Sequence, residues 1–216
     1  MNLDPARRAA FARQVQQALT EQCPGSVAVL RGSLARGTAD PYSDIDLAWT
    51  VPEAEFVACV AAVGPCLEAL AAVASLRSDP EAQRSSERRL LFVAFRDLPL
   101  FWRLDLEVMA VSAKPEVGGR VERTRSPAAG GDPDWSPAAS ALANAVAVVK
   151  AVLRGQPDVA AGLLERGLQR VGASGSASGR WRADVVRLAD AAACHEPAQR
   201  PLADQVERLA AELLEE

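Results

Sequence analysis

One short stretch constrains the fold of this chain more than any other, because it joins two strands through a glycine turn. The apolar run at residues 27–30 predicts a short buried strand, and Gly32-Ser33 then turns the chain into a helical piece. A second strand is expected from Asp44 to about residue 51. Side chains alternate along a strand, so Asp44 and Asp46 point to the same face, roughly 6–7 Å apart along the backbone. Two aligned carboxylates beside a glycine turn predict a functional site.

The residue types in this stretch favour phosphate chemistry. Clustered carboxylate oxygens are what hard cations such as magnesium require, usually together with substrate phosphates. Gly32-Ser33 supplies backbone N–H groups and a hydroxyl where a helix begins, and such groups suit a phosphate. The pattern therefore predicts that a metal and a phosphate are bound side by side.

The same residues carry a family resemblance. Gly32-Ser33, a gap of about ten residues and then Asp44-Ile45-Asp46-Leu47 resemble the signature of the nucleotidyltransferase superfamily typified by DNA polymerase beta. One departure is Arg31, where members often carry an apolar residue. The resemblance covers residues 26–110. It implies an α+β fold, a small mixed nucleotidyltransferase sheet with flanking helices, followed here by a C-terminal helical bundle.

A hairpin further along offers a third acid. Residues 90–95 form an apolar strand, residues 96–99 a turn, and residues 101–109 a returning strand that alternates cleanly between apolar and polar side chains. The resembled family places a third carboxylate on a strand beside the aspartate pair, which implies Asp105, with Glu107 as the alternative. These two acids share a face, and the strand register that would separate them is not readable from sequence.

The remaining elements of the N-terminal half are expected to be helical. Asp4-Pro5 is a good helix start, and Pro24-Gly25 ends that helix. A second helix opens near Pro52, kinks or breaks at Gly64-Pro65, and continues in helical periodicity to Val73. The buried face of this helix is expected to consist of Phe56, Val57, Val60 and Val63. Residues 78–89 are expected to form an exposed connection after it.

Composition divides the chain. We expect a catalytic domain at residues 1–114, a Pro- and Gly-rich linker or long loop at 115–137, and a helical bundle at 138–216. Trp135 is interpreted as an anchor on the interface between the domains, with a nucleobase platform as the alternative.

The resemblance implies an enzyme, a metal-dependent nucleotidyltransferase with a two-metal mechanism. Asp44, Asp46 and Asp105 would hold two Mg²⁺ ions, and Glu107 would be a supporting residue or a base for the acceptor hydroxyl. Lys150 and Arg154 lie on one face of the first helix after the linker, and a basic residue of such a helix reaches the triphosphate in relatives. The expected nucleotide contacts are Gly32, Ser33, Arg36, Ser43 and Lys150.

The acceptor is the open question. The chain is closest in outline to small bacterial antibiotic nucleotidyltransferases, which act on aminoglycosides or lincosamides, and this implies transfer of AMP from ATP, or of another nucleotide, to a hydroxyl of a small molecule. The net charge of −4 favours a cationic acceptor and gives no nucleic-acid footprint. The alternative is a protein-modifying or antitoxin-type nucleotidyltransferase module acting on a partner protein. A catalytically dead binding domain is disfavoured, because all three acidic positions are filled.

No segment of the sequence indicates export or membrane insertion. The N-terminus lacks the apolar core of a signal peptide, and no apolar run is long enough to span a bilayer, so a soluble cytoplasmic protein is expected. The four cysteines lack metal-type spacing and are expected to be small buried thiols. The single histidine, His195, fits the C-terminal end of a helix. The oligomeric state stays open.

Overall fold

The computed structural model describes residues 3–79, 82–83, 85–113 and 135–215. The chain divides into two compact units, residues 1–135 and 136–216. Residues 115–134 of the expected linker lie outside the described residues, and its last residue, Pro137, already begins a helix. Each unit is described here by itself.

The first unit is built on a five-stranded mixed sheet in the order β1-β2-β5-β4-β3. Strands β2 and β5 run parallel, and the other neighbouring pairs run antiparallel. This confirms the predicted α+β fold with a small mixed sheet. The strands are β1 (Val27–Leu30), β2 (Ile45–Val51), β3 (Val73–Ser78), β4 (Arg88–Phe95) and β5 (Leu104–Ala110).

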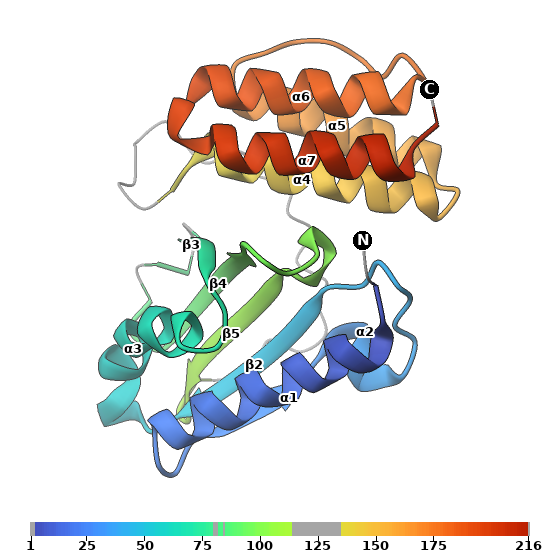
Figure 1. Cartoon of the computed structure of the whole chain (residues 1–216). Helices are drawn as coiled ribbons and strands as arrows, with labels where there is room; N and C mark the ends of the chain where they lie inside the picture. Colours follow the sequence, from blue (N-terminus) through green and yellow to red (C-terminus); the bar gives the residue numbers. More distant parts are fainter. Residues whose placement is uncertain (1–2, 80–81, 84, 114–134, 216) are drawn as a thin grey trace. The chain divides into compact units, whose positions relative to one another are not determined.

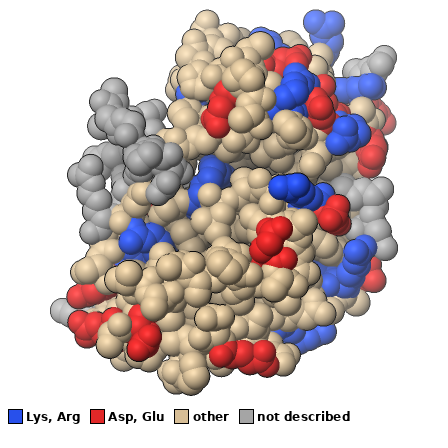
Figure 2. Space-filling view, turned by 60° about the vertical axis from the view of Figure 1, so that its left-hand side comes forward, with Lys and Arg blue, Asp and Glu red and all other residues tan. Residues whose placement is uncertain are grey.

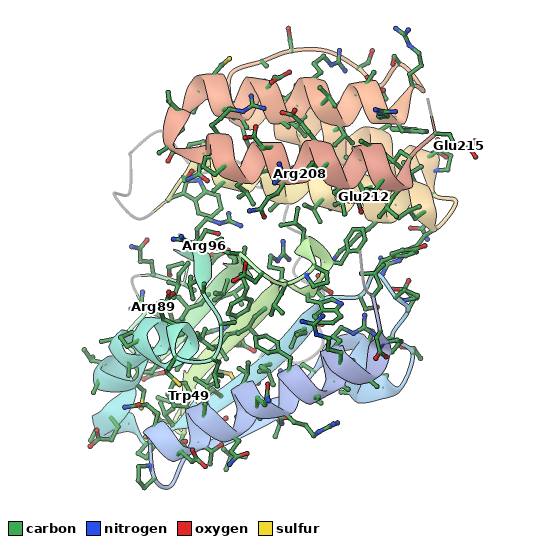
Figure 3. All side chains as sticks on the ribbon, in the orientation of Figure 1. Trp49, Arg89, Arg96, Arg208, Glu212 and Glu215 are labelled. Carbon is green, nitrogen blue, oxygen red and sulfur yellow. The ribbon has the colours of Figure 1, made fainter. Side chains whose placement is uncertain are left out.

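Two helices cover one face of this sheet, as Figure 1 shows: α1 (Pro5–Gln22) and α3 (Phe56–Glu68). The start of α1 is fixed as predicted, because the Asp4 carboxylate accepts a hydrogen bond from the Ala6 N–H at 2.9 Å. The sheet meets these helices with side chains that are almost fully buried. Among them is Trp49, labelled in Figure 3, whose indole N–H donates to Ser26 Oγ at 2.9 Å. Burial of large apolar side chains is the main favourable term in folding, so this face stabilises the unit.

The region after α3 differs from the prediction. Helical periodicity was expected to reach Val73, but α3 runs through Pro65 to Glu68, and Val73 begins β3. Proline removes one hydrogen bond from the last turn of the helix, while the buried side chain of Leu67 keeps that turn against the core. The missed strand is an edge strand, where one side of the ladder is unpaired and the sequence pattern is weak.

Three burial predictions are also wrong. Strand β1 is not buried, because it is the other edge of the sheet and Val27 is 57% exposed. In α3 the core position is Cys59 rather than Val57, which is 77% exposed. Cys194 is exposed, whereas Cys23 and Cys59 are buried as expected.

The described residues of the second unit form four α-helices and a short 3-10 helix, which confirms the predicted C-terminal helical region. Small residues allow the helices to pack closely: a Cβ added at Gly167 on α5 would lie 2.6 Å from Leu188 Cδ2 on α6. Within the parts of the chain that the structure describes, no helix is both long and apolar enough to cross a bilayer. The helices are α4 (Pro137–Leu153), α5 (Pro157–Arg170), α6 (Trp181–His195) and α7 (Arg200–Leu213).

Candidate active site

The second face of the sheet carries the predicted acids. Asp46 on β2 and Asp105 on β5 are direct register partners on parallel neighbouring strands, so their side chains leave the sheet side by side. Asp44 lies two residues before Asp46, at the entry to β2. Glu107 is opposite Ala48 instead. The register thus brings Asp105, and not Glu107, next to Asp46, while the roles of these acids in catalysis stay predictions.

The glycine turn lies directly against the second aspartate. Gly32 begins the short helix α2 (Gly32–Arg36) with φ of +58°, a conformation that glycine adopts readily. A Cβ at this position would lie 1.9 Å from Asp46 Oδ2, so no side chain fits between the turn and the carboxylate. The turn is fixed to β2 by the Arg31 N–H, which donates to the Asp46 carbonyl at 2.8 Å. Turn and acid therefore form one local unit, as the motif spacing predicts.

A buried arginine that the sequence interpretation missed holds the loop before Asp44. The Arg8 side chain, only 1% exposed on α1, donates from Nη1 to the carbonyl oxygens of Asp40, Pro41 and Ser43 at 2.7, 3.3 and 3.0 Å. Burial lowers the pKa of the Arg8 guanidinium, and the carboxylates of Asp40 and Asp44 oppose that shift. The covering helix thereby fixes the backbone that leads into the acidic strand.

Arg103 is a second arginine that the sequence interpretation did not use. Its Nε and Nη2 donate to Asp105 Oδ1 and Oδ2 at 2.6 and 2.8 Å, and Nη2 lies 3.7 Å from Asp44 Oδ2. Burial lowers the pKa of the Arg103 guanidinium, but the carboxylates of Asp105, Asp44 and Asp46 outweigh burial and raise it above its ordinary value. Arg103 is therefore charged whenever the acids are.

Glu107 has its own cationic neighbours. Arg88 Nε donates to Glu107 Oε1 at 2.6 Å, and Arg31 Nη2 lies 3.6 Å from Glu107 Oε2. Arg31, the departure from the family pattern, thus contributes a positive charge at the edge of the acid cluster. On this side of the sheet, Arg103 therefore lies beside Asp44 and Asp105, while Arg88 and Arg31 lie beside Glu107.

An aromatic and cationic row continues from the acids across the sheet. Phe92 on β4 is the register partner of Asp105, and Arg77 on β3 is the register partner of Phe92. The Arg77 and Arg103 guanidinium carbons lie 5.6 and 5.4 Å from the centre of the Phe92 ring. Trp135 lies beyond them, with its ring centre 5.6 Å from Arg77. The role of Trp135 as an interface anchor stays a prediction.

The donors suit a divalent cation, but their present arrangement does not converge on one. Three aspartates supply the oxygen ligands that magnesium prefers. Within the described residues, no group of three or more acidic, His or Cys side chains is arranged to hold a metal ion. Arg103 gives a physical reason, because both oxygens of Asp105 face its guanidinium rather than the other two aspartates.

The predicted nucleotide contacts are spread over different environments. Ser33 is half-buried at the turn, and Arg36 is exposed at the end of α2. Ser43 is buried, and its hydroxyl bonds within the loop, donating to Asp40 Oδ1 at 2.8 Å and accepting from the Asp40 N–H at 3.0 Å. Lys150 lies on α4 in the second unit. Contact between these residues and a nucleotide stays a prediction.

The charges on one face of the molecule can be followed in a space-filling view (Figure 2). Figure 2 shows acidic and basic side chains intermixed over the described residues of the visible face, with no continuous basic stripe there. Proteins that hold nucleic acid by its phosphates present such a stripe. This view therefore gives no sign of a phosphate-backbone footprint.

Comparison with known families gives a match inside the first unit. Residues 12–91 match a family model described as "Nucleotidyltransferase domain", and the match contains the glycine turn, Asp44 and Asp46. This part of the chain is similar to nucleotidyltransferase domains. The nucleotidyltransferase match confirms the resemblance to the polymerase-beta-like superfamily. It ends before Asp105, so the third acid rests on strand register alone.

Solved structures similar to the chain are distant. One is titled "Structure of the non canonical Poly(A) polymerase complex GLD-2 - GLD-3", with 15% identity and a TM-score of 0.38 over 77% of this chain and 42% of that chain. Another is titled "structure of GLD-2/RNP-8 complex", with 13% identity and a TM-score of 0.37 over 84% of this chain and 56% of that chain. The chain thus spans about half the length of these proteins. No curated protein sequence matches it.

Proposed function

We propose that the acid cluster on the sheet face opposite α1 and α3 transfers a nucleoside monophosphate from a nucleoside triphosphate to an acceptor hydroxyl. The observation that carries this proposal is the register pairing of Asp46 with Asp105, with Asp44 and the Gly32 turn beside them. Paired carboxylates next to a close backbone approach are what metal-assisted phosphoryl chemistry requires. The family of residues 12–91 supports the reaction class.

In this proposal Asp44, Asp46 and Asp105 would hold magnesium, with two ions as the expected number. Bound metal would neutralise the triphosphate and lower the pKa of the attacking hydroxyl. The residues of the chain supply positioning: Arg8 fixes the loop before Asp44, and Gly32 leaves room for close backbone approach. ATP is the first nucleotide to test, and the transferred group would be AMP.

For the acceptor we propose a small hydroxylated molecule with positive charge, such as an aminoglycoside- or lincosamide-like antibiotic. The support is the net charge of −4. A protein acceptor is the second candidate, because residues 12–91 and the acid cluster require only a hydroxyl.

The test uses the full chain, α-labelled nucleoside triphosphates and magnesium, with three acceptor arms: hydroxylated antibiotics, purified host proteins and an RNA oligonucleotide. We expect label on a small molecule, and none after addition of a chelator or in Asp44→Asn. Label on protein or RNA would mean that the acceptor is a protein or an RNA instead of a small molecule, while the proposed transfer reaction would stand. If no arm is labelled and no pyrophosphate is released, the proposed function is wrong.

A further inference from the structure

Arg103 is held among the acids that the proposed function assigns to a metal. It lies two residues before Asp105, directly before β5 begins, and it contacts both oxygens of that carboxylate. Its side chain is 20% exposed, whereas Asp105 is 6% exposed. A guanidinium paired to a carboxylate through two parallel hydrogen bonds is among the stronger polar contacts in proteins. The chain thus places its own cation on the innermost acid.

The position of Arg103 is fixed from two sides. The ring of Phe92, the cross-strand neighbour of Asp105, lies 5.4 Å from the guanidinium carbon. On the other side, Nη2 approaches Asp44 to 3.7 Å while it bonds Asp105. The guanidinium therefore lies between an aromatic face and two carboxylates. This is a complete binding site for a cation, made from β4, β5 and the entry to β2.

The two partners differ in their freedom to move. Asp105 has a short side chain in the middle of a paired strand, with Leu104 and Leu106 fully buried on either side. Arg103 precedes β5 and has a long side chain that is partly exposed to solvent. If a metal ion is to bind Asp105, the guanidinium is the group that must leave.

We propose that Arg103 is a resident counter-cation, which a divalent cation must displace from Asp105 in order to bind. The inference rests on the proposed function, because it takes Asp105 as a metal ligand. A displaced guanidinium needs a new acceptor, and phosphate oxygens match its planar donors as well as a carboxylate does. When a metal ion binds together with a triphosphate, the metal ion is therefore a new partner for Asp105 and the triphosphate is a new partner for Arg103.

Two consequences follow from this exchange. The metal ion alone binds weakly, because it must displace the Arg103 guanidinium from Asp105, and that guanidinium then has no comparably strong acceptor. The triphosphate strengthens metal binding, and by thermodynamic reciprocity the metal strengthens triphosphate binding by the same factor. Without Arg103, metal binding becomes tighter and depends less on the nucleotide.

The test is a titration of the full chain with Mn²⁺, in which free Mn²⁺ is measured by electron paramagnetic resonance, with and without a non-hydrolysable nucleoside triphosphate. We expect Arg103→Gln to tighten Mn²⁺ binding in the absence of nucleotide by roughly tenfold or more, the equivalent of one lost hydrogen bond to a charged group. Arg103→Lys keeps the charge and loses the parallel pair, so it tightens binding by less.

Arg88→Gln is the matched control. It removes a guanidinium that pairs with the other acid of β5 at the same 2.6 Å, with the arginine 30% exposed. If loss of any positive charge on this face improved cation binding, Arg88→Gln would act like Arg103→Gln. We expect its Mn²⁺ affinity to stay within about twofold of the unaltered chain, since charges away from the ligands are screened by salt.

Asp46→Asn separates the inference from the proposed function on which it rests. Loss of Mn²⁺ binding in Asp46→Asn supports the metal site. If that loss occurs and neither Arg103 variant tightens binding, the exchange is wrong while the site stands. If Asp46→Asn binds Mn²⁺ as well as the unaltered chain, both are wrong. Should Arg103→Gln fail to fold, Arg103→Lys decides, and unchanged or weaker Mn²⁺ binding in it overturns the exchange.

Discussion

The two faces of the sheet are formed by the same strands, but one face is apolar and the other carries ionic side chains. On the face covered by α1 and α3, Ile45, Leu47 and Leu106 are at most 2% exposed and contribute apolar burial. On the other face, the alternate positions of the same strands carry Asp46, Asp105 and Glu107, with arginines between them. Apolar contacts are non-directional and tolerate some repacking, whereas the ionic contacts depend on individual atoms.

This difference separates stability from activity. Carboxylates held close together repel one another, so the acidic face costs free energy that the covered face must offset. We therefore expect substitutions on the two faces to have different readouts. Those on the acidic face change transfer with little loss of folding, and those on the covered face change folding with little effect on transfer per folded molecule.

The largest expected effect is on the acidic face. Asp46→Asn should lower the rate of nucleotidyl transfer by about 10²–10³-fold or more, because it removes a carboxylate that is proposed to hold the metal ion at the reacting phosphate. Its melting temperature should stay within a few degrees, since one repelling charge is lost and the side-chain volume is kept. Label transfer and thermal unfolding measure the two effects. Thr50→Val, on the same strand and face, is the control and should keep its activity; full activity in Asp46→Asn would refute the separation.

On the covered face, Leu106→Ala should lower the free energy of unfolding by about 2–5 kcal/mol, because Leu106 is fully buried and the cavity cannot close completely. Urea unfolding measures this loss. Leu76→Ala, at a position that is 40% exposed, should cost less than about 1 kcal/mol. Similar losses in the two variants would mean that the covered face is not the main source of stability.

Arg8 connects the two faces, because it reaches from α1 to the loop that leads into Asp44. Arg8→Met keeps much of the apolar stem and removes the donor to three carbonyl groups, so we expect a loss of about 2–3 kcal/mol in unfolding free energy. Transfer should also slow, since the backbone before Asp44 is no longer held. Arg7→Met, at an exposed neighbouring position, is the control. Equal stability of both variants would show that the loop before Asp44 keeps its conformation without the Arg8 side chain.

A smaller effect on stability is expected at the glycine turn. Gly32 and Gly37 have φ of +58° and +67°, so alanine at either position should cost about 1–2 kcal/mol of backbone strain. Only at Gly32 does the added Cβ meet a carboxylate, whereas nothing lies within 4 Å of one at Gly37. Gly32→Ala should therefore lose nucleotide binding, measured by calorimetry, and Gly37→Ala should keep it. Equal affinities would place the triphosphate elsewhere.

The local part of this architecture was predictable from sequence. The aspartate strand, the hairpin and the start of α1 were predicted because periodicity, turn residues and caps act over a few residues. Strand β3 was missed for the same reason. Its sequence, Val-Ala-Ser-Leu-Arg-Ser, has little β-branched content, and Leu67, Leu70 and Val73 continue a helical spacing. The returning strand of the hairpin begins at Leu104 rather than at residue 101, because Leu100–Trp102 form a short 3-10 helix.

The partners of the candidate site depend on long-range packing and could not be read locally. Arg8 lies 35 residues from Ser43, and nothing near Arg8 in the sequence indicates this contact. Arg103 precedes Asp105 on the same face, which was a usable signal, because a basic residue two positions before an acid on one strand face can pair with it. The register that sets Asp105 opposite Asp46 was likewise beyond sequence pattern.

The most direct test of the proposed active site compares Asp105→Asn with Glu107→Gln in the label-transfer assay. The two acids share a strand and a face, and each is paired with an arginine at 2.6 Å, but only Asp105 is the register partner of Asp46. We expect Asp105→Asn to abolish transfer and Glu107→Gln to retain measurable transfer. If Glu107→Gln is inactive while Asp105→Asn transfers label, the cross-strand pair of Asp46 and Asp105 is not the active site.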